Sequence, residues 1–99
     1  MAIEITNVKI YPFDTSTTGG KVKAMAEIEI GHGLLIKGLK VVEGKNGGVF
    51  VGYPSRRGRD GVYREIVQPI NRETESAIRH AVIEAYKKSL ENKKVENTT

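Results

Sequence analysis

Cysteine and tryptophan are both absent from this 99-residue chain, and aromatic residues make up only 6% of it. A chain without cysteine has no disulfide, no thiolate ligand for zinc and no cysteine nucleophile, which is typical of proteins from a reducing cytosol. Its uninterrupted apolar runs are only a few residues long, far below the roughly 20 residues that a membrane-spanning helix needs. We therefore expect a cytoplasmic protein that is not inserted in a membrane.

Residues that commonly carry chemistry are also scarce. His32 and His80 are the only histidines, and neither stands at a spacing that pairs it with a nucleophile or a cluster of carboxylates. The glycines near Gly31 lack the third glycine of a dinucleotide loop, and Gly38–Lys45 is followed by Asn46, where a phosphate loop needs a magnesium-binding hydroxyl. We expect neither enzymatic activity nor a metal, a cofactor or a small-molecule substrate.

The length and composition indicate one small domain. Ninety-nine residues, of which 38% are hydrophobic and 28% charged, suffice for a single core but leave much apolar surface uncovered, so self-association would help. Lys and Arg number 16 against 12 Asp and Glu, which gives a formal net charge of +4 that suits a polyanionic partner without requiring one. We expect one domain over residues 1–90, followed by a polar, frayed tail over residues 91–99.

Alternating apolar residues predict an antiparallel sheet. The clearest alternation runs from Val22 to Ile30, where one face should be buried and the other mostly wet. A change of phase near Thr6 predicts a bulge, and Gly38 inside a strand predicts a bulge or a close neighbour. Asn46 and the glycine after it are a strong hairpin signal, because both residues tolerate positive φ. Strands are expected over residues 3–11, 22–30, 34–42, 49–53 and 62–67.

A helix is expected from Arg72 to Leu90. Asn71 can cap its first turn, and Glu73 and Glu75 place negative charge where the helix dipole favours it. The apolar stripe of this helix is wider than packing on one sheet usually needs, so part of it is expected to meet a second subunit. The predicted fold class is α+β, with an antiparallel sheet of about five strands followed by a C-terminal helix.

The densest positive charge lies in a polar, glycine-punctuated loop expected over residues 55–61 and in the strand that follows it. Guanidinium groups bind phosphate with two parallel donors and stack on bases, and flanking glycines let the backbone approach a phosphodiester closely. The alternative is a solvated loop in which one arginine, Arg57 or Arg64, pairs with a neighbouring carboxylate and the others keep the protein soluble. The arginines of this segment are Arg56, Arg57, Arg59 and Arg64.

Two tyrosines flank the arginine-rich segment. Tyr53 precedes it and Tyr63 lies in the strand expected after it. Aromatic side chains of single-strand binders stack on unpaired bases, but packing at the ends of strands is a more common use of such residues. The sequence alone leaves both roles open.

A resemblance to a known family rests on the segment GVFVGYPSRR over residues 48–57, followed by Asp-Gly at 60–61 and Pro-Ile-Asn at 69–71. These motifs are similar to those of SpoVG, the stage V sporulation and septation protein family, and the resemblance covers nearly the whole chain. It implies a small bacterial protein that has an antiparallel sheet and a C-terminal helix, forms dimers, affects septation and sporulation, and binds DNA and RNA as a regulator.

The resemblance also implies which residues make the contact. By position, the family's Ser-basic-Arg residues fall on Ser55, Arg56 and Arg57, and its basic residue after Asp-Gly falls on Arg64. The chain departs from the family's pattern at Tyr53, where methionine is frequent, at Gln68, where histidine is frequent, and at Arg59, where proline is common. The residues expected to bind nucleic acid are Ser55, Arg56, Arg57, Arg59 and Arg64.

We therefore expect a homodimeric regulator that binds DNA or RNA and influences septation and sporulation. The alternative is a protein-interaction module that acts on septation through a protein partner. Ionic strength distinguishes the two, because phosphate binding releases counterions and weakens steeply with salt, whereas a mostly apolar interface barely responds.

Overall fold

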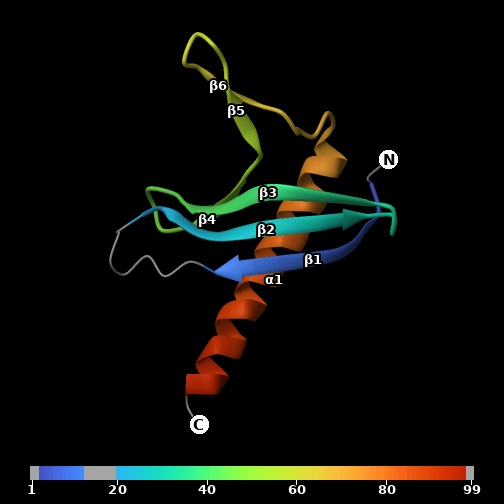
Figure 1. The fold of residues 1–99 in the computed structure, drawn as a ribbon. Helices are drawn as coiled ribbons and strands as arrows, with labels where there is room; N and C mark the ends of the chain where they lie inside the picture. Colours follow the sequence, from blue (N-terminus) through green and yellow to red (C-terminus); the bar gives the residue numbers. More distant parts are fainter. Residues whose placement is uncertain (1–2, 13–19, 98–99) are drawn as a thin grey trace.

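Six strands and one helix follow one another in the computed structural model, which describes residues 3–12 and 20–97. Strands β1 to β4 form an antiparallel sheet in the order β1-β2-β3-β4, and β5 and β6 form a separate two-stranded sheet (Figure 1). The predicted α+β class, with an antiparallel sheet and a C-terminal helix, is confirmed. The elements are β1 Ile5–Pro12, β2 Val22–Ile30, β3 Leu34–Glu43, β4 Val49–Gly52, β5 Ser55–Arg57, β6 Tyr63–Glu65 and α1 Arg72–Asn97.

Both irregularities that the sequence predicted are present in the sheet. The register of β1 on β2 shifts between Ile5 and Asn7, which confirms the predicted bulge at Thr6. The register of β2 on β3 shifts again on the stretch of β3 that contains Gly38. Gly38 has a φ of 87°, and a Cβ there would lie 3.5 Å from ring carbons of Pro54. Both a bulge and a close neighbour therefore account for glycine at this position.

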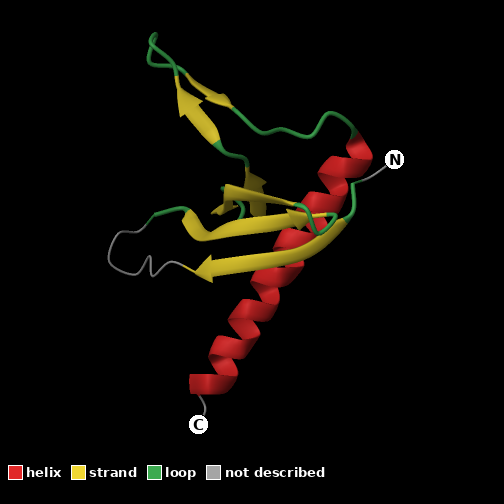
Figure 2. Ribbon diagram, turned by 45° about the vertical axis from the view of Figure 1, so that its right-hand side comes forward, coloured by secondary structure: helices red, strands yellow, loops and turns green. Residues whose placement is uncertain are grey.

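The hydrophobic core lies between the sheet and α1, which packs across one face of the sheet (Figures 1 and 2). Alternate residues of β2 are fully buried, as the sequence pattern predicted, because each points toward the helix. The other face of the sheet is not covered by any element of residues 3–12 and 20–97. The buried core consists of Ala24, Ala26, Ile28, Leu39, Val41, Ile78 and Val82.

The helix begins at Arg72 because Asn71 caps it. The Asn71 Oδ1 atom accepts a hydrogen bond of 2.8 Å from the backbone N–H of Thr74, which satisfies one of the free donors of the first turn. The helix then continues to Asn97, past the predicted end at Leu90, so residues 91–97 of the predicted tail are helical. No glycine or proline stands in that stretch to end the helix. Within the described residues, no helix is long and apolar enough to cross a membrane.

Candidate nucleic-acid interface

The segment that was predicted to be a basic loop is a β-hairpin, and the prediction of an irregular loop over residues 55–61 is wrong. Ser55–Arg57 pairs with Tyr63–Glu65, so the strand predicted over residues 62–67 is also shorter than expected. The hairpin extends away from the rest of the molecule, and neither of its strands lies against the sheet or α1 (Figure 2). We call residues 55–65 the arm.

The turn at the tip of the arm depends on glycine and aspartate. The Gly61 N–H donates to the Gly58 carbonyl at 3.0 Å, the Gly58 N–H donates to the Val62 carbonyl at 2.9 Å, and Gly61 has a φ of 81°. The Asp60 Oδ1 atom accepts the Val62 N–H at 3.1 Å. This capping role was not assigned from the sequence, although Asp-Gly between two extended segments is its signal.

Arg64, one of the predicted contact residues, is engaged within the arm. Its Nη2 atom lies 2.7 Å from Asp60 Oδ2, and its Nη1 atom lies 3.2 Å from Asp60 Oδ1, so the pair is bidentate. A Cβ at Gly58 would lie 2.8 Å from Arg64 Nη1 and from Asp60 Oδ1, so a larger residue at that position would displace the ends of these two side chains. One arm arginine thus pairs with a neighbouring carboxylate, as the solvated-loop alternative expected.

The other arm arginines are exposed, and the hairpin register decides which way they face. Arg56 lies directly opposite Arg64, and Arg57 lies opposite Tyr63. Since successive residues of a strand point to opposite faces, Arg56 and Arg57 project from different sides of the arm. Among the described residues, no carboxylate pairs with Arg56, Arg57 or Arg59. Each side of the arm therefore carries an unpaired guanidinium that favours an added anion.

The structure distinguishes the two tyrosines that the sequence left open. Tyr63 is 67% exposed on the arm and can present its ring to a ligand. Tyr53 packs against the core instead, and its hydroxyl is buried without a hydrogen-bond partner among the described residues. Burial raises the pKa of the Tyr53 phenol. Of the two rings, that of Tyr63 is therefore the one available for stacking on a base.

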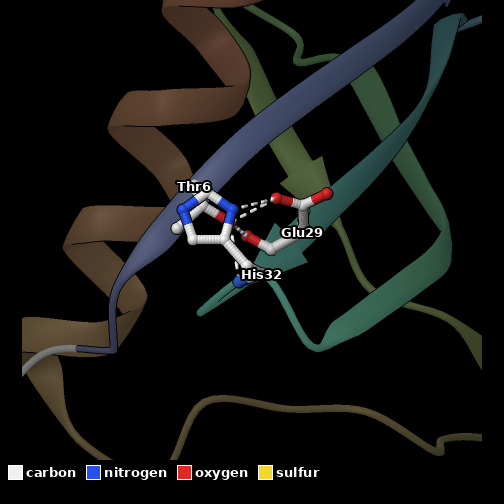
Figure 3. Close-up of polar contacts among 3 residues, drawn as sticks. All are labelled: Thr6, Glu29 and His32. Atoms are coloured by element: carbon white, nitrogen blue, oxygen red, sulfur yellow. Dashed lines mark hydrogen bonds and ion pairs between the residues drawn. The ribbon is translucent and has the colours of Figure 1, made fainter.

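A second polar cluster, formed by Thr6, Glu29 and His32, lies at the turn between β2 and β3 (Figure 3). The Thr6 hydroxyl donates to Glu29 Oε2 at 2.6 Å and accepts the His32 backbone N–H at 3.2 Å. His32 Nδ1 lies 3.2 Å from the same carboxylate oxygen. The imidazole contacts the carboxylate rather than the Thr6 hydroxyl, so the three side chains do not form the hydroxyl–imidazole pair of a nucleophilic enzyme. The cluster ties the turn to the bulge of β1.

The described part of the chain also lacks a cluster of metal-binding side chains. In residues 3–12 and 20–97, no group of three or more histidine, aspartate or glutamate side chains is placed to hold a metal ion. The exposed arginines of the arm form a cluster that suits an anionic ligand.

Titration of Asp60 tests the geometry of the arm. Because Arg64 holds the pKa of the Asp60 carboxyl below its ordinary value of 3.8, the ionised carboxylate favours the ordered arm. The ordering of the arm that this ion pair provides is complete above pH 3.8 and is lost as the pH falls through the lowered pKa of Asp60. An NMR titration of the Asp60 carboxyl carbon should show this lowered pKa, and Arg64→Met should return it toward 3.8. An identical pKa in the variant would mean that the pair does not form in solution.

The fold and the site define a small α+β protein that carries an arginine-rich arm outside its core. Residues 3–88 match the family model described as SpoVG. The chain belongs to the SpoVG family, which confirms the resemblance seen in the sequence motifs.

Relatives from distant organisms match over almost their whole length. One from Archaeoglobus fulgidus is 43% identical over 83 residues, which cover 84% of this chain and 93% of the relative. One from Agathobacter rectalis is 37% identical over 90 residues, which cover 91% of this chain and 99% of the relative. One from Bacillus cytotoxicus is 36% identical over 94 residues, which cover 95% of this chain and 93% of the relative. Each relative is named as a septation protein SpoVG, a role that the name itself marks as provisional.

Proposed function

We propose that this protein is a homodimeric nucleic-acid-binding regulator that influences septation and sporulation, and that its arm contacts DNA or RNA. The observation that carries the proposal is the exposure of Arg56, Arg57 and Arg59 on a hairpin outside the core, with no carboxylate partner among the described residues. Membership of a family whose members are named for septation supports the cellular role.

The arm suits a phosphate backbone for three reasons. Arg56, which has no carboxylate partner among the described residues, can bind a phosphate with two parallel donors. Arg57 on the other side and Arg59 at the tip can hold neighbouring phosphates of the same strand. The Ser55 hydroxyl at the base of the hairpin adds a neutral donor of the kind that contacts phosphate oxygens.

Tyr63 adds a second mode of contact. Its exposed ring stands opposite Arg57 on the same face of the arm, so a base stacked on Tyr63 would have its phosphate within the field of that guanidinium. Stacking of this kind takes place on unpaired bases, whereas phosphate contacts serve single and double strands alike.

A second candidate function is the binding of a protein partner. It is favoured by the apolar side chains of Val62, Tyr63 and Ile66, which are exposed on the arm and at its end. An apolar surface of this kind is a common feature of protein interfaces. In this case the effect on septation arises through the partner protein, and the arginines form a polar rim.

Titration against duplex DNA and against RNA, each at two salt concentrations, distinguishes the two functions. If the three unpaired arginines of one arm each neutralise a phosphate, the affinity for duplex DNA should fall about fortyfold between about 50 and 200 mM salt. Affinity that barely changes with salt would favour the protein-partner function. An absence of binding to either nucleic acid at low salt would rule out the proposed one.

A further inference from the structure

An apolar surface lies where the arm rejoins the body of the molecule. Residues 66–71 lead from β6 to α1 (Figure 1), and residues 67–71 border a cavity of about 290 Å³ whose lining is mostly apolar. Its apolar lining includes Ile36, Leu39 and Ile78 from β3 and α1. Ile70 also borders the cavity, yet its side chain is 89% exposed. Sequence reasoning missed Ile70, because Pro-Ile-Asn predicts only the start of the helix.

We propose that a second copy of this chain docks on this surface, with Ile70 of each copy entering the cavity of the other. The inference rests on the dimer in the proposed function and assigns its interface. The apolar stripe of α1 is another candidate surface in the described chain, but the surface beside Ile70 combines a projecting apolar side chain with a mostly apolar hollow that can receive one.

That combination is what a two-fold dimer requires. In such a dimer the same patch of each subunit faces the other, so the patch must be complementary to itself. Here the projecting group, Ile70, and the receiving group, the cavity beside it, belong to one patch. A two-fold axis beside Ile70 therefore makes both contacts at once.

The exposed area of the chain is consistent with an uncovered interface. A compact monomer of 10.9 kDa exposes about 5,600 Å² by the usual scaling with mass, whereas this chain exposes 7310 Å². The excess is more than the roughly 800 Å² that each partner buries in a standard interface. Ile66 and Ile70, both exposed on the connecting segment, account for part of the excess.

The polar group in the cavity also suits a second copy. Tyr53 borders the cavity, its hydroxyl is buried without a hydrogen-bond partner among the described residues, and a buried polar group is normally satisfied in a native structure. A segment that inserts Ile70 also carries Gln68, whose side-chain carbonyl is an acceptor. The docked segment therefore brings both an apolar side chain for the cavity and an acceptor for Tyr53.

The first test compares arginine substitutions at two exposed positions. Ile70→Arg should weaken self-association about a hundredfold in sedimentation equilibrium, because it places a charge where the interface needs an apolar group. Leu90→Arg is the matched control, since Leu90 is 42% exposed in α1, twelve residues beyond Ile78 of the cavity lining, and should leave the dimer intact. Circular dichroism of both variants should match that of the parent chain.

The second test uses the absence of cysteine from the chain. When a chain carrying Ile70→Cys is mixed with a tagged chain carrying Ile36→Cys and oxidised, a disulfide-linked heterodimer should form. The control mixture, with Leu90→Cys in place of Ile36→Cys, should not form it. The tag distinguishes this product from dimers of one variant.

The outcomes separate this interface from the function on which it rests. A parent chain that sediments as a monomer would overturn the dimer itself. A dimer that survives Ile70→Arg and does not form the Ile70–Ile36 link would overturn only the interface. Salt-dependent binding of nucleic acid is measured independently of both results.

Discussion

Replacing Arg56 and Arg57 together by alanine is expected to weaken nucleic-acid binding about a hundredfold, because each substitution removes a charge-assisted hydrogen bond of roughly 1.5 kcal/mol. The slope of log affinity against log salt should become shallower by about two, one for each phosphate that is no longer neutralised. The fold should be retained, because neither side chain contributes to the core. Fluorescence anisotropy over a range of salt concentrations measures both quantities.

The control for this experiment is a variant with the same reduction of charge elsewhere. Lys87→Ala with Lys88→Ala removes two exposed lysines from the C-terminal part of α1, which lies away from the arm (Figure 1), and should leave affinity within about twofold, since distant surface charges are screened. The single variants of Arg56 and Arg57 then show how the loss of affinity divides between the two sides of the arm. If the arginine pair and the lysine pair reduce affinity equally, binding depends on net charge and the arm does not bind the nucleic acid directly.

The largest effect on stability is expected from Leu39→Ala. Leu39 is fully buried between the sheet and α1, and truncation of such a side chain costs about 2–5 kcal/mol of unfolding free energy. Leu34→Ala, in the same strand but 58% exposed, should change it by only about 0.5 kcal/mol or less. Urea denaturation followed by circular dichroism compares the two. Equal decreases would mean that the core does not lie on this face of β3.

The sheet could be predicted from the sequence because its signals are local. Alternation from Val22 to Ile30 indicates a strand with one buried face, and the phase change at Thr6 indicates a bulge within that same strand pair. Asn46 and Gly47 form a turn whose geometry depends on those two residues. In each case the residues that carry the pattern are also the residues that adopt the structure.

The candidate site could be predicted only in part. The cluster of arginines was visible, but the pairing of Arg64 with Asp60 depends on a hairpin register that an arginine-rich segment does not reveal. Tyr53 and Tyr63 look alike in the sequence and differ only in what packs around them. The exposure of Ile70 depends on the path of the chain between β6 and α1, which no local pattern specifies.

The position of α1 after all the strands affects the order in which the core can form during synthesis. Each strand of the four-stranded sheet pairs with its neighbour in sequence, so the sheet can begin to assemble as soon as each strand leaves the ribosome. Its apolar face has no covering layer until residues 72–97 have emerged, because α1 supplies that layer. A nascent chain that stalls before Arg72 therefore exposes Ala26, Ile28 and Val41, a surface that chaperones recognise and on which such chains aggregate.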